Sequence, residues 1–322
     1  MRRIITVPHQ LSFRQNQTFT ITQFTDIHWK NGGEEDQLSL RLMEEVLDAE
    51  QPDLVVFTGD VIYTGYVTPG EPICEKPLQA FKDAVQAAES RGIPWAVAFG
   101  NHDTEQAITR EELMNSVLEH KHTVASPGPI QLNGVGNYVL QIAGSDDKPA
   151  AVLYLFDSGN LSPLPHVKGY DWIRSDQIAW YREESHKLRD HAGGNALPAL
   201  AFFHIPLPEY KEVWDKETCY GHKFEDVCSA KVNSGLFNAM VEMGDVMGTF
   251  VGHDHTNDFT GELHGIRLCY GRASGYNTYG KEGFPRGARM IRLRQGVREF
   301  ETWLRLADGT VVREQPEHVP EK

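Results

Sequence analysis

The chain has 322 residues, of which 40% are hydrophobic and 24% are charged, and this ordinary globular composition excludes a chain that is disordered throughout. Its formal net charge of −14 would repel a polyphosphate backbone, so we expect no nucleic acid partner. No apolar run is long enough to span a bilayer, and no signal peptide is visible at the first residues. These features predict a cytoplasmic protein without a membrane partner.

Apolar strand-like runs and helical segments alternate along the first part of the chain. In chain order we predict a strand at 19–24, a helix at 38–47, a strand at 53–57, a helix at 81–92 and a strand at 93–99. A capping box formed by Thr109 and Glu112 predicts the start of the next helix, and Ser175 opens another. The alternation, which continues with strands at 199–203 and 247–251, predicts an α/β sandwich.

The pattern changes from residue 258 onward, where glycines separate short runs. The runs at 290–293 and 300–304 are typical of antiparallel strands. No internal repeat and no linker divides the chain, so we predict a single domain over residues 1–322. Surface excursions are expected at 62–76, 158–174 and 208–233.

Polar side chains follow the five buried strands at the points where the strands end. They are Asp26, His28, Asp60, Asn101, His204, His253 and His255. Carboxylate, amide and imidazole groups are ligands for hard and borderline divalent metals. Because the carboxyl ends of strands in an α/β sheet meet at one edge, these groups are expected to lie close together.

Each motif has a simpler explanation when it is taken alone. Asp-x-His and Gly-Asp are common in turns, and a histidine after an apolar run is more often a buried core residue. Gly-Asn-His-Asp could be a turn that leads into a helix N-cap. Only Gly-His-x-His, which places two imidazoles on one face of an extended chain, is by itself a metal signal. The order of all five motifs, each behind a strand, is what makes chance improbable.

The chain contains four cysteines, none of them with the spacing of a zinc motif. Cys219 and Cys228 flank a short loop and could form a disulfide. In the absence of a signal peptide we favour two free thiols.

The complete pattern resembles the calcineurin-like metallophosphoesterase superfamily, and more closely its purple-acid-phosphatase-like branch. The phrases at 53–60, 203–208 and 252–255 carry the resemblance, which extends from about residue 22 to residue 287. It implies a four-layer α/β/β/α sandwich of two mixed sheets flanked by helices. It also implies phosphate ester hydrolysis by a hydroxide that bridges two metal ions, with Mn, Fe, Zn or Ni all suited to the ligands.

The resemblance implies a role for each residue of the pattern. One metal would be held by Asp26, His28, Asp60 and His255, and the other by Asp60, Asn101, His204 and His253. His102 would act as general acid or charge stabiliser at the leaving oxygen, and Asp103 would orient the imidazole of His102.

Two further positions near these motifs, Tyr63 and Arg272, each have two interpretations. Purple acid phosphatases match this chain at Tyr63, which in them binds iron, but they have glycine where this chain has His28. We expect His28 to occupy the coordination position, which argues against an iron–tyrosinate chromophore. Arg272 could bind a substrate phosphate, or it could belong to a glycine-rich hairpin without a role in binding.

Three functions are compatible with the motifs. The first is a phosphomonoesterase acting on a phosphorylated small molecule or a phosphoprotein. The second is a phosphodiesterase that cleaves cyclic nucleotides or glycerophosphodiesters. The third is a metal-binding scaffold without turnover, which is disfavoured because every position of the pattern is filled.

Overall fold

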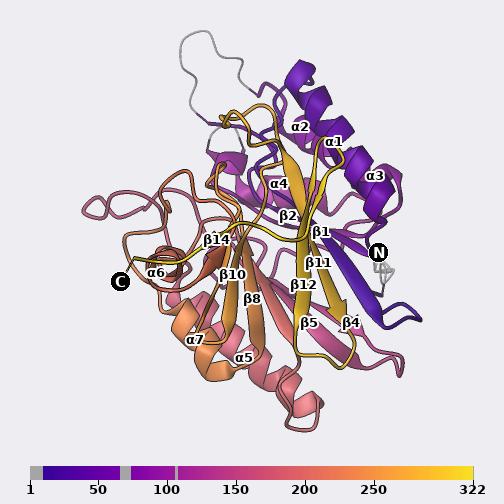
Figure 1. Ribbon diagram of the computed structural model, residues 1–322, viewed down its shortest axis with the longest axis vertical. Coiled ribbons are helices and arrows are strands. Elements are labelled where there is room, and N and C mark those ends of the chain that lie inside the picture. The colour runs from indigo at the N-terminus through magenta and orange to yellow at the C-terminus, as the bar shows by residue number, and fades with distance from the viewer. Residues whose placement is uncertain (1–9, 66–73, 106–107, 322) are drawn as a thin grey trace.

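The computed structural model describes residues 10–65, 74–105 and 108–321. Part of the predicted excursion at 62–76 therefore lies outside the described residues. Within the described residues, no helix combines the length and the apolar character needed to cross a bilayer. The chain folds around two β-sheets that pack face to face (Figure 1).

The first sheet has six strands in the order β13-β12-β11-β1-β2-β3. Their bounds are β1 (Thr18–Phe24), β2 (Leu54–Thr58), β3 (Trp95–Ala98), β11 (Gly287–Arg294), β12 (Phe300–Leu306) and β13 (Val311–Val312). Strands β1, β2 and β3 run parallel to one another, whereas β11 pairs with β1 antiparallel. The carboxyl ends of the three parallel strands therefore meet at one edge of this sheet.

The second sheet has eight strands in the order β14-β7-β9-β10-β8-β6-β5-β4. Their bounds are β4 (Tyr138–Ala143), β5 (Pro149–Leu155), β6 (Ala199–Phe202), β7 (Cys219–Tyr220), β8 (Val246–Val251), β9 (Thr260–Leu263), β10 (Ile266–Tyr270) and β14 (Glu317–His318). The central strands β5, β6, β8 and β10 are parallel. Both sheets are thus mixed, as predicted.

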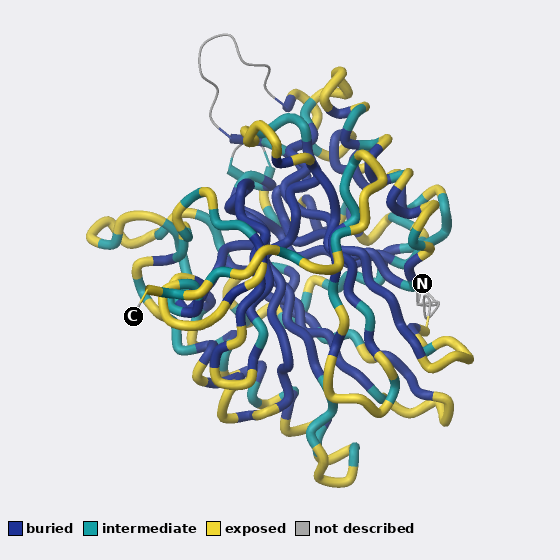
Figure 2. Tube along the Cα trace, in the orientation of Figure 1, coloured by how far each residue is buried: buried dark blue, intermediate teal, exposed yellow. Residues whose placement is uncertain are grey.

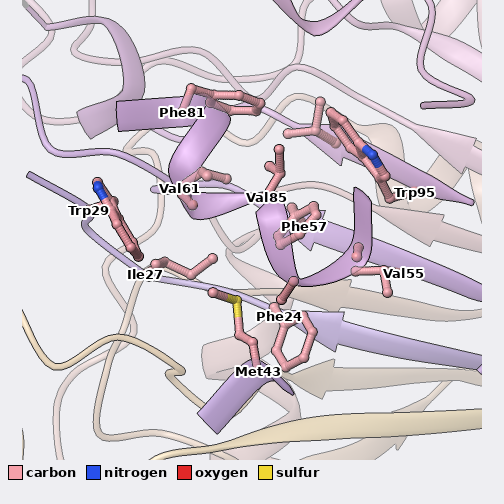
Figure 3. Packing of buried hydrophobic residues seen from close by; sticks show 14 of the residues in the cluster. Phe24, Ile27, Trp29, Met43, Val55, Phe57, Val61, Phe81, Val85 and Trp95 are labelled. Atoms are coloured by element: carbon pink, nitrogen blue, oxygen red, sulfur yellow. The ribbon is translucent and has the colours of Figure 1, made fainter. Parts of the chain in front are cut away.

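Helices cover the outer face of each sheet. The first group is α1 (Glu34–Glu50), α2 (Pro77–Ala84), α3 (Gln86–Ser90) and α4 (Arg110–Val117), and the second is α5 (Ser175–His191), α6 (Glu209–Lys216) and α7 (Leu236–Met243). Side chains of the first group share a core with β1–β3, part of which is shown in Figure 3. The second group shares another core with β5, β6 and β8. The predicted four-layer α/β/β/α sandwich is confirmed.

Strand residues alternate between the two kinds of core because successive side chains point to opposite faces of a sheet. In β2, Val55 and Phe57 pack under the helices, whereas Leu54 and Val56 pack between the sheets. The central strands are consequently buried on both faces, which Figure 2 shows as continuous dark blue. Buried strands of this kind hold the residues at their ends rigidly.

The sequence missed some elements and joined others. The helix predicted at 81–92 is broken at Val85, where α2 ends and α3 begins. Strands β4 and β5 and helices α6 and α7 were not predicted. The capping box at Thr109 and Glu112 is confirmed as the start of α4, and α5 begins at Ser175 as predicted.

Candidate metal centre

The seven residues that were predicted to bind metal lie directly after five parallel strands of the two sheets. Asp26 and His28 follow β1, Asp60 follows β2, Asn101 follows β3, His204 follows β6, and His253 and His255 follow β8. All seven are at least nine-tenths buried. The packing of one sheet on the other therefore brings groups more than two hundred residues apart in the sequence to one place.

Two groups of side chains in this cluster could each hold an ion. Within each group, one ligand atom per residue lies within 4.8 Å of all the others. The first group is Asp26, His28, Asp60 and His255, and the second is Asp60, His204 and His253. Asp60 belongs to both groups, which is the geometry of a carboxylate shared by two ions.

Three buried polar atoms of the cluster have no hydrogen-bond partner among the described residues: His28 Nε2, Asp60 Oδ2 and Asn101 Oδ1. An unpartnered buried polar atom costs about 1–3 kcal/mol. Asp60 Oδ2 nevertheless lies 3.1 Å from His204 Nε2 and 3.5 Å from His28 Nε2. Coordination of metal would satisfy all three atoms, so the residues present fit divalent ions with nitrogen and oxygen ligands.

Neighbouring groups fix the orientation of several of these side chains. His204 Nδ1 lies 2.8 Å from the Thr58 carbonyl oxygen, which leaves His204 Nε2 facing the cluster. His255 Nδ1 lies 2.6 Å from Thr278 Oγ1. Partners of this kind on the far nitrogen set the tautomer and the angle of a metal-binding imidazole.

The backbone at the site adopts conformations that L-residues rarely take. Asp26, His28, Asp60 and His253 have φ values of 54°, 53°, 50° and 78°. Such left-handed conformations cost about 1–3 kcal/mol each and cluster at functional sites. The strain at these four residues supports a role beyond packing.

Close approach between strand ends requires glycine at two positions beside the ligands. A Cβ on Gly100 would lie 2.1 Å from Asp60 Oδ1, and a Cβ on Gly252 would lie 2.7 Å from Asp26 Oδ2. Any larger residue would displace these carboxylates. Gly100 therefore makes room for Asp60 from the neighbouring strand of its own sheet, and Gly252 makes room for Asp26 from the other sheet.

The charges of the cluster are strongly coupled. Burial lowers the pKa of His253 to about 3, and the charge of His204 adds to this shift. Burial also lowers the pKa of His204, but the Asp60 carboxylate outweighs it and raises the pKa to about 9. Burial opposes ionisation of Asp60, yet the charges of His204 and His102 hold its pKa well below its usual range. Without metal, the cluster keeps a proton on His204 that coordination would displace.

The role predicted for Asp103 is wrong. Its carboxylate accepts hydrogen bonds from the backbone amides of Asp60, Ile62 and Gly100, at 3.1, 2.9 and 2.8 Å. It therefore stabilises the loops that carry Asp60 and Asn101. The imidazole of His102 instead contacts Glu105 through Nδ1, at 2.9 Å from Oε2. The sequence offered no signal for Glu105, because the contact depends on how the chain turns after His102.

The guanidinium of Arg272, for which a substrate contact was one of two predictions, is bound within the protein. Arg272 is 4% exposed, its guanidinium pairs with the Asp258 carboxylate, and Nε donates to the Pro285 carbonyl oxygen at 2.8 Å. These contacts use the guanidinium inside the protein. The predicted hairpin is absent, because residues 271–286, all of which the structure describes, connect β10 of the eight-stranded sheet to β11 of the six-stranded sheet.

Two other expectations can be compared with the structure. The ring of Tyr63 stacks beside that of His28 with centroids 5.7 Å apart, and His28 belongs to the first ligand group. Cys219 and Cys228 are free thiols, as favoured above, and Cys219 is buried whereas Cys228 is exposed.

Comparison with known proteins identifies relatives of this chain by sequence. A model of the calcineurin-like phosphoesterase family matches residues 19–257. The protein named probable inactive purple acid phosphatase 29, from Arabidopsis thaliana, is 36% identical, over 93% of this chain and 85% of its own length. Phosphatase DCR2 of Saccharomyces cerevisiae is 33% identical, over 95% of this chain and 56% of its own length.

Solved structures share the fold. A dimetal phosphatase from Danio rerio superposes with a TM-score of 0.58 at 14% identity, over 88% of this chain and 98% of that one. The purple acid phosphatase PPD1 of yellow lupin, Lupinus luteus, superposes with a TM-score of 0.55 at 13% identity, over 94% of this chain and 54% of that one. The family match and the sequence relatives together show that this chain belongs to the calcineurin-like phosphoesterase family, with relatives of the purple-acid-phosphatase type.

Proposed function

We propose that this chain is a phosphoesterase with two metal ions, and that it hydrolyses phosphomonoesters. The observation that carries the proposal is the pair of buried ligand groups that share Asp60. Two divalent ions, when bound, lower the pKa of a water molecule and polarise the phosphate oxygens. The first ion would be held by Asp26, His28, Asp60 and His255, and the second by Asp60, Asn101, His204 and His253.

The remaining chemistry belongs to residues of the chain. The side chain of His102 is 28% exposed, so a substrate in the site can reach it while its neighbours are buried. Burial lowers the pKa of His102, but the carboxylates of Asp60 and Glu105 outweigh this and raise it above its usual value. A protonated imidazole at this position would donate a proton to the leaving oxygen as the ester bond breaks.

The names of the relatives support two of the functions considered above. Phosphatase DCR2 carries the name of an active hydrolase, which favours monoester hydrolysis. The Arabidopsis relatives are named probable inactive purple acid phosphatases, which favours a silent scaffold. In this chain every ligand position and His102 are filled, so we place it with the hydrolases. A phosphorylated small molecule or phosphoprotein in the cytoplasm would be the substrate.

Hydrolysis by metal-stripped protein reloaded with Mn²⁺ tests the proposal, with p-nitrophenyl phosphate compared with bis(p-nitrophenyl) phosphate. We expect a preference for the monoester. Asp60→Asn should lose metal and activity together, whereas His102→Ala should keep its metal and lose about 10²–10⁴-fold in rate on ethyl phosphate, whose alkoxide leaving group needs a proton. His186→Ala, at an exposed position of α5, is the matched control.

Each other outcome has a defined meaning. A preference for the diester would replace the phosphatase by a phosphodiesterase with the same metal centre. Unchanged hydrolysis in both Asp60→Asn and His102→Ala would show that the site is elsewhere. Tight metal binding without turnover of either ester would favour the scaffold.

A further inference from the structure

Glu105 contacts the proposed general acid His102, although none of the sequence motifs described above includes Glu105. Its Oε2 is 2.9 Å from His102 Nδ1, and the two side chains are 12% and 28% exposed. A carboxylate at this distance accepts the Nδ1–H of the imidazole. The other ring nitrogen, Nε2, is then left for the substrate.

The segment after β2 holds this pair in place. The backbone amide of Glu105 donates to Thr64 Oγ1 at 2.9 Å. Thr64 in turn donates to the His102 carbonyl oxygen through its hydroxyl at 2.7 Å and through its amide at 2.9 Å. Thr64 is 2% exposed, so one buried side chain fixes both ends of the pair.

The next residue, Gly65, gives the pair the space that it needs. A Cβ at Gly65 would lie 2.0 Å from Glu105 Oε2 and 3.1 Å from His102 Nδ1. Even alanine would therefore push the carboxylate away from the imidazole. The carboxylate belongs to the segment after β3, whereas the Thr64 hydroxyl and Gly65 belong to the segment after β2. The contact therefore depends on two separate segments, unlike an incidental contact between exposed side chains.

We infer that Glu105 is the positioning residue of His102, an inference that rests on the function proposed above. Glu105 accepts the Nδ1–H of the imidazolium, so that the Nε2–H is held toward the leaving group, and the neutral ring that remains after proton transfer keeps its hydrogen on Nδ1. During hydrolysis the ester P–O bond breaks with its electron pair on oxygen, and the proton of Nε2 passes to that oxygen. Water supplies the new P–O bond and restores a proton to the imidazole, so the products are an alcohol and phosphate.

The test compares esters with good and poor leaving groups. An alkoxide is a poor leaving group and needs the proton from His102, whereas p-nitrophenolate leaves without it. In Glu105→Ala we expect kcat for ethyl phosphate to fall about 10–100-fold, the effect typical of removing an orienting partner. We expect kcat for p-nitrophenyl phosphate to fall only about threefold or less, and metal content to be unchanged. Glu105→Gln keeps an acceptor oxygen and should recover part of the loss.

A second variant reaches the same pair without removing the charge. Gly65→Ala should show the selectivity of Glu105→Ala because the added methyl group displaces the carboxylate. Gly33→Ala is the matched control, since a Cβ there meets nothing nearer than Glu35 Oε2 at 3.9 Å. It should leave both substrates unaffected.

NMR of the imidazole nitrogens supplies a readout that does not depend on turnover. In metal-free and in Zn²⁺-loaded protein, His102 should carry hydrogen on Nδ1, and Glu105→Ala should lose this preference. If both substrates slow equally, or if the tautomer is unchanged in Glu105→Ala and in Gly65→Ala, the inference is wrong. If the wild-type protein hydrolyses neither ester, the proposed function fails, and the tautomer alone decides whether Glu105 positions His102.

Discussion

Several individual residues of the metal centre combine deep burial with strained backbone conformations. Four ligand positions have left-handed backbone conformations, and three ligand atoms are buried without partners among the described residues. The unpartnered atoms destabilise the fold unless an ion compensates for them, whereas the strain of the left-handed conformations must be offset by the surrounding packing. Other buried charges near the site, such as the pair Asp258 and Arg272, are already satisfied within the protein and serve stability instead.

Asp258→Asn should destabilise the protein in a pH-dependent way. Burial raises the pKa of Asp258, but His222 and the Arg272 guanidinium outweigh it, so the pKa lies below its ordinary value of 3.8. Folding therefore favours the carboxylate, and its contribution is present above about pH 4 and lost as the pH falls through the folded pKa. At about pH 7 we expect a loss of about 3 kcal/mol in the free energy of unfolding, because Arg272 would be left buried without its partner.

Urea unfolding of the wild-type protein and the variant, from neutral pH down to about pH 3, measures this difference. The difference should shrink as the pH falls. Asp226→Asn is the control, because the Asp226 side chain is fully exposed and its loss should change little. A difference that stays constant with pH would contradict the role given to the carboxylate.

At the scale of elements, the N-terminus of helix α4 stabilises a loop that carries one of the metal ligands. Helix α4 begins at Arg110, whose guanidinium donates from Nη2 to the Gly100 carbonyl oxygen at 2.9 Å and to the Gly159 carbonyl oxygen at 2.8 Å. The first residue of a helix thus braces the loop that carries Asn101. The start of α4 is itself set by Thr109, which accepts from the Glu112 amide at 3.2 Å.

Thr109→Ala should therefore weaken α4 at its N-terminus. Removal of a threonine N-cap costs about 1 kcal/mol, which should appear as a lower midpoint of urea unfolding without a change in slope. Thr109→Ser keeps the hydroxyl group and should behave like the wild-type protein. Equal destabilisation by alanine and serine would mean that the methyl group, not the cap, is what stabilises this helix.

At the scale of the whole molecule, the centre joins the two halves of the sandwich. Asp26, Asp60 and Asn101 come from the sheet of six strands, and His204, His253 and His255 come from the sheet of eight. Ions at this place would tie one sheet to the other, in addition to the apolar side chains packed between them. Their removal should consequently affect global stability.

Chelation should lower the melting temperature in a single transition, because we expect residues 1–322 to form one domain. A ligand at a thousand times its Kd stabilises the folded state by about 4 kcal/mol. Scanning calorimetry with Mn²⁺ and with chelator measures the shift, and Asp60→Asn should show none. Two separate transitions would contradict the single domain, and an equal shift in Asp60→Asn would place the stabilising ions elsewhere.

The sequence by itself determined the class of fold and the candidate ligands. Short continuous apolar runs bounded by turn residues indicate strands that are buried on both faces, and the polar residues after them can be read directly from the sequence. This is why the strands before Asp26, Asp60 and His204 were located correctly, and why the structure brings their side chains together. Two-residue edge strands such as β13 and β14 lack a comparable signal, and their identity depends on the partners with which they pair.

Only the tertiary structure decided which groups meet. Glu105, rather than Asp103, reaches the His102 ring because the loop after β3 turns the Asp103 carboxylate toward three backbone amides. Arg272 pairs with Asp258, fourteen residues earlier, so its guanidinium is bound within the protein. Contacts of this kind depend on how the loops after the strands fold against one another, which spacing along the chain does not encode.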